Sequence, residues 1–121
     1  MVEGYDAKPQ ILMSLENVYN LLDGIPELIG MEPLGTPVVY NVTEKHHPDI
    51  GVTGMQIITT SHISIHTFPV GMRDGNARQR DPFFTFDIYS CKPYDANKII
   101  ALLGEWSGAK QMETQVINRF S

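Results

Sequence analysis

A serine, two histidines and a cysteine carry the side chains best suited to covalent or acid–base chemistry in this chain. Ser61 is followed by His62 and His66, and Cys91 lies further along. A serine hydroxyl attacks a carbonyl group once a neighbouring base takes its proton, and histidine and cysteine side chains move protons readily. The sequence therefore predicts nucleophilic or acid–base chemistry around Ser61.

The residues after Ser61 alternate as in a half-buried strand. One face of this predicted strand is polar and consists of His62, Ser64 and His66. The other face is the core face and consists of Ile63, Ile65 and Thr67. Side chains two positions apart share a face of a strand. A β-rich run at 55–60 precedes this segment. Ser61 is therefore predicted at the join of two extended segments, where a bend exposes the Thr60 carbonyl to the Ser61 hydroxyl.

The rest of the chain predicts the elements that position this segment. They are at most a short strand within 1–9, a helix from an N-cap at Ser14 to Gly24 and Pro26 with a further turn at 26–29, strands at 38–42 and 83–91, a helix from an N-cap at Asp95 to Gly108, and a last strand at 111–117. The polar segment 71–82, with three arginines, is interpreted as a flexible, solvated loop. The expected fold class is α+β, a mainly antiparallel sheet with two helices packed on one face.

Length and composition narrow the class of protein. A chain of 121 residues predicts a single domain over 1–121. The net charge of −5, without a run of Lys or Arg, argues against a nucleic-acid or anionic-membrane partner. The lone cysteine cannot form an internal disulfide, and no apolar run is long enough to span a bilayer. We therefore expect a cytoplasmic protein that binds neither nucleic acid nor membranes.

All four histidines fall between His46 and His66, which raises the question of a metal site. On one face of a strand, His62 and His66 lie roughly 13 Å apart, since each residue advances the chain by about 3.3 Å. Metal ligands must be much closer together. The sequence therefore predicts no metal centre.

Three blocks of the sequence resemble the prokaryotic S-adenosylmethionine decarboxylase proenzyme family. They are GVTG at 51–54, SHISIHTFP at 61–69 and DIYSC at 87–91. The family pattern is approximately G-[VL]-S-G, then E-S-H-[IL]-[ST]-I-H-T-[WF]-P-E, then D-[IVL]-[FY]-[ST]-C. The order of the blocks and the nearly contiguous central block make the match specific, and weaker similarity extends over most of the chain.

The resemblance implies a lyase that makes its own cofactor. Ser61 would attack the carbonyl of Thr60, and autocatalytic cleavage of this zymogen would give chains of residues 1–60 and 61–121 with a pyruvoyl group in place of Ser61. The ketone would form a Schiff base with the substrate and act as the electron sink of a decarboxylase. In the family the product supplies the aminopropyl group for spermidine in polyamine biosynthesis, and the enzymes generally form homodimers.

The resemblance also assigns roles to individual residues. Thr53 and His66 match residues that act in processing, and His66 also lies beside the substrate. Cys91 matches the general acid that returns a proton to Cα, and the alternation of both strands allows it to share a face with His66. The substrate-binding positions of the family are matched by His47, Phe68 and Val70.

Three of the matched positions differ from the family pattern. Thr60 replaces the glutamate before the processed serine, and His47 replaces an aromatic residue that stacks on adenine. Val70 replaces a glutamate that binds ribose hydroxyls, and valine cannot accept those hydrogen bonds. Two alternatives therefore stay open. One is a pyruvoyl decarboxylase of another amino acid, arginine or ornithine. The other is an unprocessed, non-catalytic homologue that acts as a binding protein.

Overall fold

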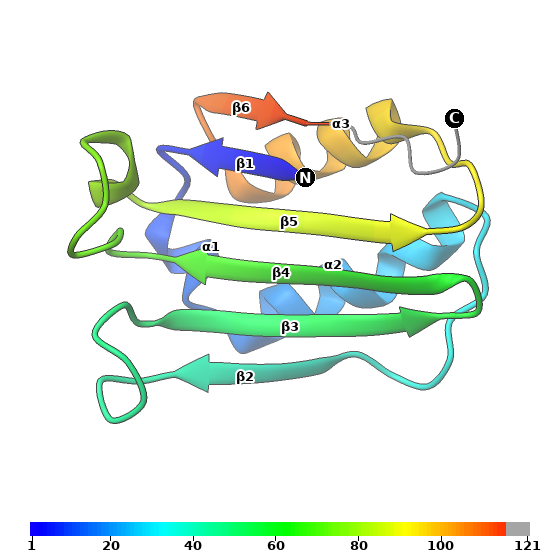
Figure 1. Ribbon diagram of the computed structural model, residues 1–121, viewed down its shortest axis with the longest axis horizontal. Coiled ribbons are helices and arrows are strands. Elements are labelled where there is room, and N and C mark those ends of the chain that lie inside the picture. The colour runs from blue at the N-terminus through cyan, green and yellow to red at the C-terminus, as the bar shows by residue number, and fades with distance from the viewer. Residues whose placement is uncertain (116–121) are drawn as a thin grey trace.

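Six strands form one sheet in the computed structural model, which describes residues 1–115. The strands are β1 (Val2–Tyr5), β2 (Val38–Val42), β3 (Gly51–Ile58), β4 (Ser61–Phe68), β5 (Phe83–Ser90) and β6 (Gln111–Thr114). Their order across the sheet is β2-β3-β4-β5-β1-β6, and every neighbouring pair of these strands is antiparallel (Figure 1). The central position of β4 puts the residues after Ser61 in the middle of the sheet.

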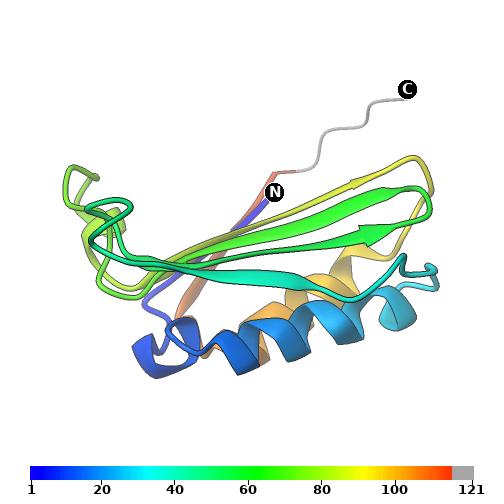
Figure 2. The same cartoon turned by 90° about the horizontal axis from the view of Figure 1, so that it is seen from below.

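The helices lie together on one face of the sheet and leave the other face open (Figure 2). They are α1 (Pro9–Leu12), α2 (Leu15–Leu28) and α3 (Ala96–Ser107), and a short 3-10 turn, η1 (Arg78–Arg80), lies in the loop after β4. The predicted fold class, an α+β sandwich with a mainly antiparallel sheet, is confirmed. The four-residue α1 was not predicted. It is tied to the sheet because the Thr67 hydroxyl donates to the Leu12 carbonyl at 2.7 Å.

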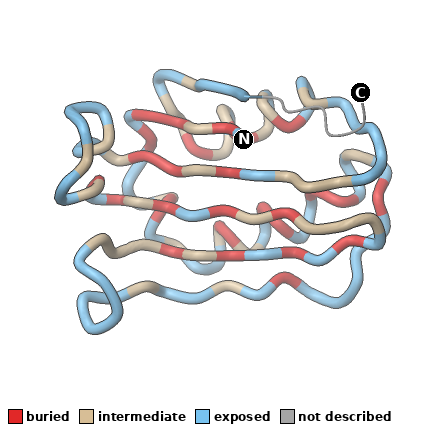
Figure 3. The backbone as a smooth tube through the Cα atoms, in the orientation of Figure 1, coloured by how far each residue is buried: buried red, intermediate tan, exposed pale blue. Residues whose placement is uncertain are grey.

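The core lies between the sheet and the helices. Buried and more exposed residues alternate along the central strands (Figure 3). The core residues with the least exposure include Leu22, Ile25, Ile63, Ile65, Phe84, Phe86 and Leu103. The Phe84 ring meets the Trp106 ring of α3 edge to face at 5.8 Å. Gly54 allows α2 to approach β3 closely, since a Cβ there would lie 2.7 Å from Leu22 Cδ1. Because successive side chains of a strand point to opposite faces, the residues between these core positions lie on the open face.

The predicted break at Gly24 and Pro26 is wrong, because the further turn predicted at 26–29 continues α2 without interruption to Leu28. Proline within a helix removes one backbone hydrogen bond, and glycine is a weak helix former. Ile25 and Pro26 are buried, and a Cβ at Gly24 would meet no other atom. Burial against the sheet therefore outweighs the local preference for a break. The N-cap of α2 is as predicted, since Ser14 accepts a hydrogen bond from the Asn17 backbone N–H.

The remaining boundaries differ in smaller ways. β3 begins at Gly51, earlier than the predicted run at 55–60, and β5 ends at Ser90. The last strand is β6, so Gln115 follows it and the predicted end at 116–117 lies outside the described residues. Helix α3 has the predicted Asp95 cap, whose carboxylate accepts from the Asn97 backbone N–H, and ends at Gly108 in the left-handed conformation.

Candidate active site

Ser61 is the first residue of β4 and directly follows the tight turn that joins β3 to β4. It is paired with Ile58 on β3 and with Ser90 on β5. The Thr60 hydroxyl lies 3.2 Å from the Ser90 hydroxyl and 3.8 Å from the sulfur of Met31. The bond between Thr60 and Ser61 therefore lies at the turn of a hairpin, at the predicted join of two extended segments. Strand β4, which begins at Ser61, is paired with β3 on one side and with β5 on the other.

The imidazole of His62 is in contact with the Ser61 hydroxyl. The distance from Ser61 Oγ to His62 Nδ1 is 3.4 Å. The ring of His62 stacks on that of Tyr89, its neighbour across β5, with centroids 5.7 Å apart and an interplanar angle of 11°. This contact fixes the plane of the imidazole beside the hydroxyl.

Cys91 lies at the same end of the sheet as Ser61. It follows Ser90, the strand partner of Ser61, and its thiol is free and exposed. We call Thr60, Ser61, Ser90 and Cys91 the Ser61 cluster. This end of the sheet therefore holds a nucleophile, the carbonyl that it would attack and a potential proton donor.

A second group of candidate residues lies at the opposite end of β3 and β4. The Thr53 hydroxyl lies 3.1 Å from Nδ1 of His66, its strand partner. Phe68, at the end of β4, stacks on Phe83 with ring centroids 4.6 Å apart. Val70 follows in the next turn and is exposed. We call Thr53, His66, Phe68 and Val70 the His66 cluster.

His47 lies in the loop 43–50, which enters β3 at the His66 end of the sheet. Its exposed ring accepts a hydrogen bond from the Asp49 backbone N–H at 3.0 Å, and Asp49 in turn accepts from the backbone N–H of Arg73 at 2.9 Å. The loop 43–50 is therefore tied to the loop 71–82 beside the His66 cluster.

The two clusters do not meet within one protomer. Ser61 and His66 are five residues apart on β4, which corresponds to roughly 16 Å. His66 is paired with Thr85, and Cys91 lies six residues beyond Thr85, at roughly 20 Å. Alternation allows His66 and Cys91 to share a face, as predicted, but the register keeps them far apart within a single chain. Alternation predicts the face of a side chain but not its place along the strand.

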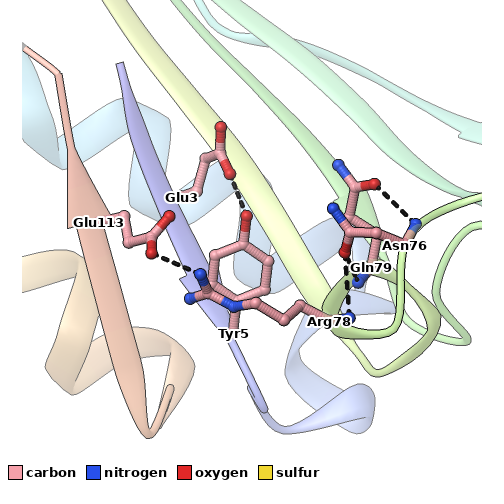
Figure 4. A network of polar contacts seen from close by, with 6 residues as sticks. All are labelled: Glu3, Tyr5, Asn76, Arg78, Gln79 and Glu113. Atoms are coloured by element: carbon pink, nitrogen blue, oxygen red, sulfur yellow. Dashed lines mark hydrogen bonds and ion pairs between the residues drawn. The ribbon is translucent and has the colours of Figure 1, made fainter.

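The loop 71–82 is exposed, yet one of its arginines is held in a network on the open face (Figure 4). Arg78 pairs with Glu113 on β6 at 2.5 Å and lies 4.0 Å from the ring centroid of Tyr5. The Tyr5 hydroxyl donates to the carboxylate of Glu3. Burial and the neighbouring Glu3 carboxylate raise the pKa of Tyr5 to about 12. For Arg78, the interpretation as a solvated loop tip is therefore incomplete, because β1 and β6 anchor it.

The sequence did not predict two contacts at this site, that of His62 with the Ser61 hydroxyl and that of Ser90 with the Thr60 hydroxyl. His62 was assigned only to a polar face, and Ser90 was not singled out. The contact of His62 has a signal in the sequence, because His62 directly follows Ser61, whereas the contact between Thr60 and Ser90 depends on strand register.

Among residues 1–115, no group of three or more His, Cys, Asp or Glu side chains could hold a metal ion. None of the helices in that range has the length and apolar character needed to cross a membrane.

Comparisons with known proteins agree on one family. A family model described as S-adenosylmethionine decarboxylase matches residues 1–120. Proteins of Clostridium botulinum strains Loch Maree (Type A3) and Langeland (Type F), each named S-adenosylmethionine decarboxylase proenzyme, are 34% identical over 106 residues, which cover 87% of this chain and 80% of theirs. The crystal structure of the adenosylmethionine decarboxylase from Aquifex aeolicus VF5 matches with a TM-score of 0.64 at 18% identity, covering 99% of this chain and 91% of that one. At that identity the structural match speaks for the fold alone.

Proposed function

This chain belongs to the S-adenosylmethionine decarboxylase family, and we propose that it decarboxylates S-adenosylmethionine with a pyruvoyl group made from its own Ser61. The observation that carries the proposal is the place of Ser61, directly after a tight turn and next to an imidazole. A serine in that place can reach the preceding carbonyl, and its chain can be cut without breaking a strand. The proposed product is the aminopropyl donor for spermidine.

The topology suits a chain that is cut between Thr60 and Ser61. Residues 1–60 contain β1, β2 and β3, and residues 61–121 contain β4, β5 and β6. In the sheet, β1 lies between β5 and β6, and β3 pairs with β4. Three strand pairs, β3–β4, β5–β1 and β1–β6, therefore join one piece to the other by backbone hydrogen bonds. We expect the two pieces to stay associated after cleavage.

The residues of the Ser61 cluster fit a pyruvoyl group at position 61. Such a group, once joined to the substrate amine, would supply the electron sink for the pair that carbon dioxide leaves behind on the substrate. Cys91, exposed at the same end of the sheet, is the proposed acid that returns a proton to Cα. A thiol with this role must stay reduced, which supports a location in the cytoplasm.

The substrate is tested by carbon dioxide release from purified, processed protein. We expect release from S-adenosylmethionine and not from arginine or ornithine supplied at the same concentration. The second candidate is a decarboxylase of one of those amino acids, and the observation that favours it is Val70, which stands exposed where the family has a carboxylate. Loss of such a partner costs about 1–3 kcal/mol of binding. Release from arginine or ornithine alone would replace the first assignment by the second.

We also propose a homodimer in which the open faces of two sheets pack together. Four apolar side chains on the open face of β2 and β3 are exposed: Val38, Tyr40, Met55 and Ile57. A two-fold axis that runs between the faces at right angles to the strands brings the His66 cluster of one protomer over the Ser61 cluster of the other. A shared site of this kind joins the residues that one protomer keeps apart.

Replacing Ile57 with aspartate is expected to separate the protomers. A carboxylate at this position would be buried without a partner in the interface, and by symmetry each dimer would contain two of them. We expect the dissociation constant to rise by at least ~100-fold, since each 1.4 kcal/mol changes it about tenfold. Light scattering at micromolar concentration measures this as a shift from the dimer mass to the protomer mass of 13.6 kDa.

The matched control for this substitution is Leu28→Asp, which places the same charge on an exposed apolar residue of α2, on the helix side of the molecule. It is expected to leave the dimer intact. A wild-type protein that has the protomer mass would contradict the proposed homodimer, and an equal loss of dimer in both variants would contradict the choice of face.

A further inference from the structure

Self-processing needs a base that takes the proton of the Ser61 hydroxyl. When Oγ attacks the Thr60 carbonyl, a bond forms between Oγ and the carbonyl carbon and the bond from that carbon to the Ser61 nitrogen breaks. The hydroxyl proton must leave Oγ, and the departing nitrogen must gain one proton to become an amine. The base must therefore be close to both atoms.

The geometry points to His62 as this base, and we propose that its Nδ1 takes the Ser61 hydroxyl proton and delivers it to the departing nitrogen. The inference rests on the function proposed above and assigns the first proton transfer of processing to a residue of the same protomer. No net proton, electron or further reactant is required, because the proton that leaves Oγ is the one that the amine receives. The product of the step is an ester between Thr60 and Ser61.

Distances within the protomer favour His62 over the other histidines. His62 Nδ1 lies 3.4 Å from Ser61 Oγ, a separation typical of catalytic pairs before they tighten for reaction. His66 is five residues away on β4, at roughly 16 Å, and its Nδ1 is in contact with Thr53. Nδ1 of a neutral imidazole accepts a proton when the hydrogen of the ring is on Nε2.

The surroundings of His62 hold its ring in place for this role. Its strand partners are Ile57 on β3 and Tyr89 on β5, and the ring stacks on Tyr89 at 5.7 Å. The hydroxyl groups of Thr60, the residue before Ser61, and of Ser90, its strand partner, are in contact with one another at 3.2 Å. Along this hairpin His62 is thus the side chain that combines a basic nitrogen, a fixed plane and contact with the nucleophile.

The test follows splitting of freshly translated chain by denatured intact mass. The variant His62→Phe keeps an aromatic ring that stacks on Tyr89 but removes the basic nitrogen, and His62→Gln keeps a polar acceptor that cannot serve as a base at neutral pH. We expect both to slow splitting by about 100-fold or more, the usual size of a general-base effect. The control His46→Phe, in the loop 43–50, is expected to split at the wild-type rate.

A second measurement separates a chemical role from a structural one. Hydroxylamine cleaves esters much faster than amides, so it releases fragments from any chain that has formed the ester. We expect hydroxylamine to release none from His62→Phe, at an unchanged melting temperature. Splitting of either His62 variant at the wild-type rate, or hydroxylamine-sensitive unsplit His62→Phe chain, would overturn the inference and leave the proposed function standing. Wild-type chain that never splits would overturn both.

Discussion

The change Ser61→Ala is expected to abolish both splitting of the chain and release of carbon dioxide. Alanine has no hydroxyl to attack the Thr60 carbonyl, so neither the ester nor the pyruvoyl group can form. Without that group the decarboxylase has no electron sink. Denatured intact mass should show two fragments that divide between Thr60 and Ser61 in the wild type, the second lighter by one ammonia than a chain with an N-terminal serine. The variant should show one full-length chain.

The matched control is Ser64→Ala, which removes the same hydroxyl three residues further along β4. It is expected to split as the wild type does. If the wild-type chain kept a single full-length mass through long incubation, the pyruvoyl mechanism would be excluded and the fold would have to be explained as a binding scaffold. If Ser61→Ala split at Thr60, another residue would be the nucleophile.

Much of the fold could be predicted because its signals are local. The alternation around Ile63 and Ile65 reflects a sheet with one buried and one open face, and the caps at Ser14 and Asp95 mark helix starts. The end of α2 could not be predicted in this way. Pro26 is a local signal for a break, but the burial of this turn against the rest of the protein is a long-range effect.

The site could be predicted residue by residue but not as an arrangement. The motif around Ser61 identifies candidates, and alternation gives the face of each. It does not give the distance between residues on different strands, which depends on register: Ser61 pairs with Ser90, whereas His66 pairs with Thr85. The contact of Arg78 with Glu113 joins residues 35 positions apart and has no local signal at all.

Two inactive variants are expected to restore activity when their chains form mixed dimers. In the proposed dimer, each site combines Ser61 and Cys91 of one protomer with Thr53 and His66 of the other. His66→Ala and Cys91→Ala should each be inactive alone. A mixed dimer has one site with both substitutions and one site with neither, because the His66→Ala chain supplies Cys91 and the Cys91→Ala chain supplies His66.

A preparation that contains only mixed dimers should have about half of the wild-type activity per chain, since one of the two sites of each dimer is intact. The measurement is carbon dioxide release by co-expressed chains with two different affinity tags, purified over both so that only mixed dimers remain.

Co-expressed Ser61→Ala and Cys91→Ala chains are the control. Both substitutions lie in the same cluster, so every site of that mixed dimer lacks one residue of the Ser61 cluster and should stay inactive. Activity of the control pair equal to that of the first pair would contradict the division into two clusters. Inactivity of the purified His66→Ala and Cys91→Ala mixed dimer would contradict a site shared between protomers, and His66 would then have to act at some distance from the reacting carbon.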